Sequence, residues 1–104
     1  MGPDLSAETE IRVLLSFHRE EVAEVRRILR DECGNNLPLS QNSDSLQMER
    51  VRFAVLKLSE GDKEKFHRAV QLAQRDWRDL LVAADFANDT EAYKSWVPTW
   101  KSSR

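Results

Sequence analysis

The chain has 104 residues, the size of one domain, and can bury a modest hydrophobic core without disulfides or metals. Its 16 Lys and Arg against 18 Asp and Glu leave a net charge of −2, which gives no overall attraction to nucleic acid or to an anionic membrane. A single cysteine excludes an internal disulfide and a thiolate zinc site, and no apolar run approaches the ~20 residues of a membrane-spanning helix. With no signal peptide in view, we expect one cytoplasmic domain over residues 1–104 and no membrane contact.

The first predicted element is a long amphipathic helix over residues 6–33. Ser6 can accept hydrogen bonds from the first backbone N–H groups, and Gly34 is placed to end the helix. Residues at spacings of three and four, a helical period, form its apolar stripe: Ile11, Leu15, His18, Val22, Val25 and Leu29. The spacing predicts one unbroken helix with His18 among the apolar side chains.

The middle of the chain predicts a loop followed by a second helix. Residues 34–45 are rich in Asn, Ser and Asp, which predicts a flexible loop. Over residues 46–58 the apolar positions keep a helical spacing, although Val51, Phe53 and Val55 also alternate with their neighbours as in a β-strand. The surrounding Met, Glu, Ala, Leu and Lys favour the helix, and the chain offers no second convincing strand for pairing.

A third long helix is predicted over residues 60–86. Ser59 is a natural N-cap for it, and Asp62 stands where a capping box places its acidic residue. The apolar residues keep the same rhythm throughout, while Asp76 is suited to cap a fresh segment after a bend. The sequence therefore leaves two alternatives, an unbroken helix to about residue 86 and a helix with a bend near Arg75 and Asp76.

The C-terminal part predicts a short helix over residues 90–96, which Pro98 ends, and then a tail over residues 97–104. The predicted fold is all-α, because the amphipathic stripes of the three main helices must cover one another. We expect a small bundle of three main helices and a short fourth.

One stretch resembles a segment of small, uncharacterised bacterial helical proteins. It runs from Leu58 through Ser-Glu-Gly-Asp to Trp77-Arg-Asp-Leu-Leu81. In those proteins a Ser-Glu-Gly-Asp turn leads into a long helix that ends in an aromatic-Arg-Asp-hydrophobic run. The resemblance covers residues 58–81 and implies a bacterial helical protein, but it transfers neither an activity nor functional residues.

Two histidines raise the question of a metal site. Glu64 and His67 have the E-x-x-H spacing that places both side chains on one helix face, and His18 with Glu21 forms a similar pair. Carboxylate-bridged di-metal bundles use two E-x-x-H pairs and two further glutamates. Only one true E-x-x-H exists here, so we predict no metal and no other cofactor, and these four residues form the metal-binding alternative. A hydrogen-bonded structural role is preferred for His18.

No motif predicts catalysis. The chain has no Gly-rich phosphate loop, no G-x-S-x-G and no H-E-x-x-H. Cys33 lies at the predicted end of the first helix, where the helix dipole raises a thiol pKa and disfavours a reactive thiolate. We predict no catalytic residue and a non-enzymatic protein.

The arginines offer a second functional hypothesis. If the second helix packs near the end of the first, five arginines could form one patch: Arg26, Arg27, Arg30, Arg50 and Arg52. Acidic residues interleave with them, which weakens a phosphate-binding surface and is typical of a solvated face with ion pairs. A nucleic-acid-associated regulator is therefore the alternative function.

Protein–protein interaction is the preferred function. The stripe on the first helix is long enough to need cover from two neighbours or from another subunit. Trp96 and Trp100 flank a proline in a short polar tail, where they either pack back onto the bundle or anchor a partner. We predict an interaction module that binds another protein or a second copy as a homodimer, with Leu14, Phe17, Trp96 and Trp100 in the interface.

Overall fold

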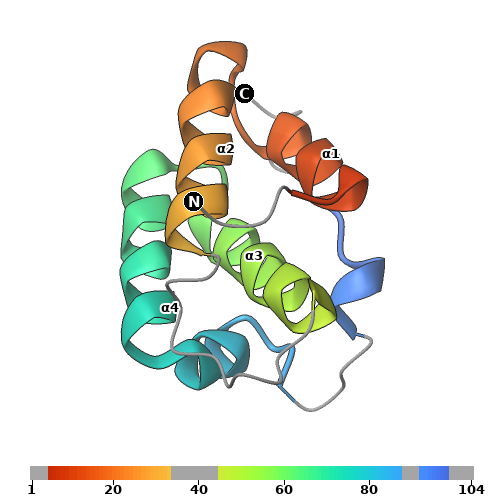
Figure 1. Ribbon diagram of the computed structural model, residues 1–104, viewed down its shortest axis with the longest axis vertical. Coiled ribbons are helices and arrows are strands. Elements are labelled where there is room, and N and C mark those ends of the chain that lie inside the picture. The colour runs from red at the N-terminus through yellow and green to blue at the C-terminus, as the bar shows by residue number, and fades with distance from the viewer. Residues whose placement is uncertain (1–4, 34–44, 88–91, 99–104) are drawn as a thin grey trace.

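The computed structural model describes residues 5–33, 45–87 and 92–98. Within these segments the chain forms four α-helices and one 3₁₀-helix: α1 (Ala7–Ser16), α2 (Arg19–Glu32), α3 (Ser45–Ser59), α4 (Lys63–Ala83) and η1 (Ala92–Ser95). These segments contain no β-strand, so the all-α prediction is confirmed, whereas the prediction of three main helices is wrong (Figure 1). The predicted end at Gly34, the rest of the loop before Ser45, and the tail beyond residue 98 lie outside the described residues.

The predicted helix over 6–33 is two helices that meet at Phe17 and His18. Both residues have extended backbone, with φ −125° and ψ 156° at Phe17 and φ −68° and ψ 155° at His18. Phe17 is fully buried and its ring meets Phe66 edge to face, with 5.5 Å between the ring centroids. The break lets α1 turn away from the axis of α2, as Figure 1 shows. The Ser6 cap is confirmed, because its Oγ accepts a hydrogen bond from the Thr9 N–H at 3.1 Å.

α3 lies at the centre of the molecule (Figure 1). It packs against α4, α1 and η1, and every side chain over residues 50–56 is buried. A helix that is covered on several sides needs apolar residues around most of its circumference, which explains why its sequence also reads as a strand. The helical prediction for this segment is confirmed, and the strand alternative is wrong.

Basic side chains of α3 donate hydrogen bonds to backbone carbonyls at the C-terminal ends of the neighbouring helices α2 and α4. Arg52 Nε donates to the carbonyl of Cys33, which caps the C-terminus of α2, at 3.0 Å. Lys57 Nζ donates to the carbonyl of Ala84, which caps α4, at 2.8 Å. The last carbonyls of a helix lack partners within that helix, and cations are favoured at this end. These contacts fix α2 and α4 around α3.

The turn between α3 and α4 differs in detail from the prediction. The N-cap of α4 is Asp62, whose Oδ1 accepts from the Glu64 N–H at 2.8 Å. Ser59 instead closes α3, since its Oγ donates to the Leu56 carbonyl at 2.6 Å. Gly61 follows with φ 75°, a left-handed conformation that glycine adopts without strain.

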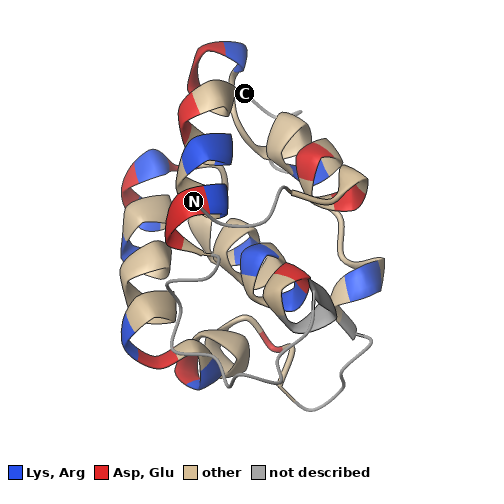
Figure 2. Ribbon diagram, viewed as in Figure 1, with Lys and Arg blue, Asp and Glu red and all other residues tan. Residues whose placement is uncertain are grey.

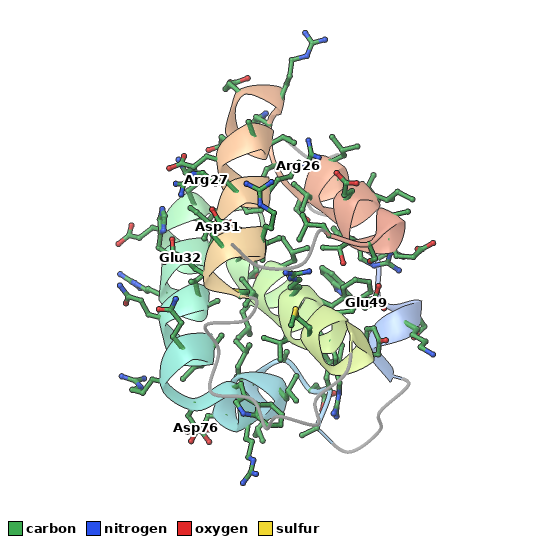
Figure 3. The ribbon with its side chains drawn as sticks, viewed as in Figure 1. Arg26, Arg27, Asp31, Glu32, Glu49 and Asp76 are labelled. Atoms are coloured by element: carbon green, nitrogen blue, oxygen red, sulfur yellow. The ribbon has the colours of Figure 1, made fainter. Side chains whose placement is uncertain are left out.

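Of the two alternatives for the long helix, the one with a bend is confirmed at Asp76. This residue has φ −158° and ψ 92° inside α4, and its Oδ1 accepts from the N–H groups of Arg78 at 3.1 Å and Asp79 at 3.4 Å. Asp76 therefore serves as the N-cap of a fresh segment, and Figure 3 shows it where α4 changes direction.

The short C-terminal helix is present as η1. It is a 3₁₀-helix, and residues 90 and 91 of the prediction lie outside the described residues. Tyr93 is buried, with its ring 5.0 Å from that of Phe53 in an edge-to-face contact. No helix in the described part of the chain is both long and apolar enough to cross a bilayer.

Candidate functional site

Helix α1 buries polar side chains and exposes aliphatic ones. Its inner side carries Thr9, Arg12, Val13 and Ser16, all of which are buried. Its outer side carries Ile11, Leu14 and Leu15, which are 48%, 53% and 39% exposed. We call these three residues the α1 apolar face. Single exposed aliphatic residues are ordinary, but these three lie on one face of one helix, opposite a side with buried polar residues.

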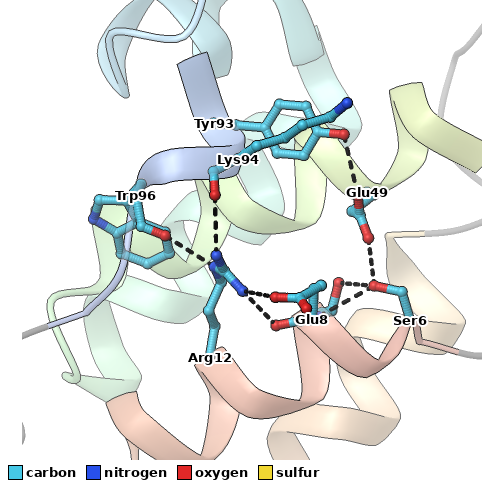
Figure 4. A network of polar contacts seen from close by, with 8 residues as sticks. Ser6, Glu8, Arg12, Glu49, Tyr93, Lys94 and Trp96 are labelled. Carbon is cyan, nitrogen blue, oxygen red and sulfur yellow. Dashed lines mark hydrogen bonds and ion pairs between the residues drawn. The ribbon is translucent and has the colours of Figure 1, made fainter. Parts of the chain in front are cut away.

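Arg12 explains how the polar side of α1 is stabilised inside the molecule. It is only 5% exposed. Its Nε donates to the Trp96 carbonyl at 2.9 Å and its Nη2 to the Lys94 carbonyl at 3.2 Å, while Nη1 reaches the carbonyl and carboxylate of Glu8 (Figure 4). The guanidinium also lies 4.3 Å from the centre of the Phe53 ring. A buried charge with this many partners fixes the rotation of α1 about its own axis.

A second set of contacts anchors the start of α1. Ser6 Oγ donates to Glu49 Oε1 of α3, and the Tyr93 hydroxyl donates to Glu49 Oε2 at 3.0 Å (Figure 4). One carboxylate thereby joins the N-cap of α1, the middle helix and η1. Together with Arg12, this network keeps the α1 apolar face directed outward.

A polar groove lies between the N-terminal part of α1 and α2. Its volume is about 440 Å³, and its lining is Leu5, Glu10, Ala23, Arg26, Arg27 and Arg30. Arg26 Nη2 pairs with Glu10 Oε1 at 2.5 Å across the two helices. Figure 3 shows Arg26 on the side of α2 that faces α1. We call this feature the α1–α2 groove.

The predicted arginine patch does not form. Arg50 and Arg52 are buried, with Arg50 Nη2 2.5 Å from the Phe86 carbonyl and Arg52 bonded to Cys33 as described above. Arg50 bonds a carbonyl of the segment that follows α4, and Arg52 bonds the carbonyl at the end of α2, so neither guanidinium is available to a nucleic acid. The prediction of a five-arginine surface is wrong, and only its α2 members line the groove.

The four residues of the metal-binding alternative do not come together in the structure. His18 is exposed as the N-cap of α2, so its predicted place among buried apolar side chains is wrong. Glu21 Oε1 accepts from the backbone N–H of His18 at 3.3 Å, and Glu64 pairs with Arg68 at 2.8 Å. His67 is exposed on α4. No cluster of His, Cys, Asp or Glu in the described segments is arranged to hold a metal ion.

The predicted interface residues divide into three groups. Leu14 is exposed on α1, whereas Phe17 is fully buried and its assignment to an interface is wrong. Trp96 is half-buried against the core, 6.4 Å from the Phe53 ring, and its carbonyl holds Arg12. Trp100 lies outside the described residues.

Cys33 is buried at the end of α2. Desolvation of the thiolate raises its pKa to about 12, although the nearby Arg52 opposes the shift. The predicted direction is confirmed, but burial is the main cause, not the helix dipole. The thiol is therefore protonated and unreactive at neutral pH.

The sequence places Ile11 and Leu15 in the apolar stripe of the first helix but does not show that their side chains are exposed. A signal for the break was present, because His18 is followed by Glu20 and Glu21, the acidic first turn of a new helix. Because the helix breaks at this point, the side of α1 that faces the core is set independently of the side of α2 that does so. Comparison with protein-family models, with curated proteins and with solved structures finds no match for this chain.

Proposed function

We propose that this protein is a non-enzymatic interaction module that associates with a second copy of itself through the α1 apolar face. The observation that supports the proposal is the orientation of α1. It exposes Ile11, Leu14 and Leu15 while burying a guanidinium and two hydroxyl-bearing side chains. An isolated monomer would gain more by burying the aliphatic side, so the exposed side is suited to a partner.

A second copy fits this surface because the surface is self-complementary. In a two-fold dimer the same patch meets itself, so apolar residues must face apolar residues and charged edges must offer both signs. The α1 apolar face meets the first requirement. The edge toward α2 meets the second, since Glu10 and Arg26 lie there side by side and can exchange partners between copies. The small net charge of −2 gives little overall repulsion.

The size of the face indicates a weak, reversible dimer. Only three aliphatic side chains from each copy are covered, and covering the exposed part of each contributes about 1 kcal/mol. The loss of translational and rotational freedom on association offsets most of this gain. The dimer is therefore expected to be weak and to dissociate on dilution.

Sedimentation equilibrium tests the proposal over concentrations from about 10 µM to about 1 mM. The wild-type mean mass should rise toward that of a dimer. The double variant Ile11→Gln/Leu15→Gln should stay monomeric, because each amide places a polar group in the apolar contact. Val82→Gln is the matched control, since Val82 is 65% exposed on α4 and outside the proposed interface.

Two results would overturn the proposal. The first is a wild-type protein that stays monomeric over the whole range. The second is self-association that the double variant retains as fully as the Val82 control, which would locate the contact on another surface. Circular dichroism of each variant shows whether the helical fold is retained.

A further inference from the structure

The α1–α2 groove carries more positive charge than its surroundings. Its lining contains three arginines and one glutamate, a local net charge of +2. Figure 2 shows basic positions on successive turns of α2, on the side that the viewer sees. The chain as a whole has a net charge of −2, so this local excess contrasts with the rest of the molecule.

Most guanidinium donors in the groove bond to no other residue that the structure describes. An arginine has five N–H donors. Arg26 uses its Nη2 toward Glu10, and Arg30 uses its Nε toward Asp31 Oδ1 at 3.2 Å. No hydrogen bond or ion pair joins Arg27 to any residue in the described segments.

The nearest acidic neighbour of Arg27 along α2 is engaged by another helix. Glu24 pairs with Lys63 of α4, and this hydrogen bond is the main reason why the pKa of its carboxyl is lowered. The Arg27 guanidinium therefore lies at the groove with its charge uncompensated by a bonded carboxylate.

We propose that the α1–α2 groove binds the phosphate group of a small phosphorylated molecule. Arg26 and Arg30 stand four residues apart on α2, a rise of about 6 Å, which suits one phosphate or a diphosphate held from both sides. Guanidinium groups bind phosphate oxygens in pairs, with two parallel hydrogen bonds. The volume of about 440 Å³ exceeds that of a phosphate alone, and Leu5 and Ala23 provide apolar contact for an attached organic group.

A nucleic-acid duplex fits the groove less well. Binding a duplex requires basic residues along an extended track, and Arg50 and Arg52, which could have extended it, are buried. The carboxylates of Glu10 and Asp31 border the site and would repel a neighbouring phosphate. The basic surface is thus confined to about one turn of α2.

Calorimetric titration with pyrophosphate at low ionic strength tests the proposal. The experiment uses the full chain at concentrations below self-association, and also the Ile11→Gln/Leu15→Gln variant. Saturable binding is expected in both proteins, which separates this proposal from the dimer.

Two substitutions of opposite effect localise the site. Arg27→Gln is expected to weaken pyrophosphate binding about tenfold, because it removes a charge-assisted contact. Glu10→Gln is expected to tighten binding about threefold, because it removes the one carboxylate in the lining. Arg68→Gln and Glu64→Gln are the matched controls on α4, where these residues form an exposed ion pair, and should leave binding unchanged.

The choice of probe identifies the ligand class. A nucleoside diphosphate should bind more tightly than pyrophosphate, since the organic group adds contact with the apolar lining. A short DNA duplex that binds more tightly than both, with a steep salt dependence, would overturn the small-molecule assignment. Absence of saturable binding, or an Arg27→Gln variant that behaves like Arg68→Gln, would overturn the site itself.

Discussion

Ser16 lies on the inner side of α1, fully buried, and its hydroxyl has no hydrogen-bond partner among the described residues. A buried hydroxyl in this state costs about 1–3 kcal/mol. We expect Ser16→Ala to raise the free energy of unfolding by about 1 kcal/mol, as measured by urea denaturation.

Ser59 provides the control for that substitution. It is equally buried, but its Oγ donates to the Leu56 carbonyl and accepts from the Gly61 N–H at 3.3 Å. Ser59→Ala should therefore lower the free energy of unfolding by about 1 kcal/mol. Equal losses in both variants would show that the Ser16 hydroxyl is bonded or solvated, contrary to the described orientation of α1.

Cys33 makes stability depend on pH in the alkaline range. Burial raises the pKa of its thiol from 9.0 in the unfolded chain to about 12 in the folded protein. The folded state thus holds the proton more tightly, and this contribution is complete below pH 9 and is lost as the pH rises from 9 toward 12.

Comparison with the Cys33→Ala variant separates the contribution of the thiol to the pH-dependent stability from the contributions of the lysines and Tyr93. The difference in unfolding free energy between wild type and variant should shrink as the pH rises through that window. A difference that stays constant would mean that the thiol is not desolvated.

At the scale of single residues, the sequence predicts local hydrogen bonding well. Ser6 and Asp76 act as the caps that their positions predict, because a cap depends on the few backbone N–H groups that follow it. His18 was predicted wrongly, because burial depends on which way the whole helix faces. The same holds for Arg50 and Arg52, whose partners come from distant segments.

At the scale of elements, the break at Phe17 decides where the α1 apolar face lies. The spacing of apolar residues continues through the break, so periodicity alone predicts one helix with one stripe. In the structure α2 keeps that stripe in the core through Val25 and Leu29, while α1 rotates and exposes Ile11 and Leu15. Local pattern cannot reveal this rotation, because it depends on the bonds from Arg12 to the carbonyls of Lys94 in η1 and of Trp96 directly after η1.

The kink in α4 offers a test at the same scale. Asp76→Ala removes the side-chain cap of the second half of α4 and should lower the free energy of unfolding by about 1 kcal/mol. Asp76→Asn keeps an acceptor oxygen and should lower the free energy of unfolding much less. Thermal or urea unfolding of the pair distinguishes them, and equal stability of both variants and the wild type would contradict the capping role.

At the scale of the whole molecule, α3 organises the fold. It lies between the other elements, and its basic residues close the ends of α2 and α4. The sequence predicts the helical class and most helix ends from periodicity and caps. It does not predict which helix lies in the middle, because that depends on contacts between segments far apart in the chain.

The central arrangement also explains why α1 has an unusual surface. α3 meets α1 through Arg12 and Phe53 and meets η1 through Glu49 and Tyr93, so the polar side of α1 becomes part of the interior. The aliphatic side is then left at the surface. On the other border of α1, the pair of Glu10 and Arg26 links this surface to the α1–α2 groove.

The most direct test of the account is a nuclear Overhauser experiment on a mixture of isotope-labelled and unlabelled protein at high concentration. The account predicts contacts between the methyl groups of Ile11 and Leu15 in one copy and the α1 apolar face of the other. Contacts of these methyl groups with core residues of their own chain, such as Val25 or Phe66, would contradict it, as would contacts between copies that involve only Val82 on α4.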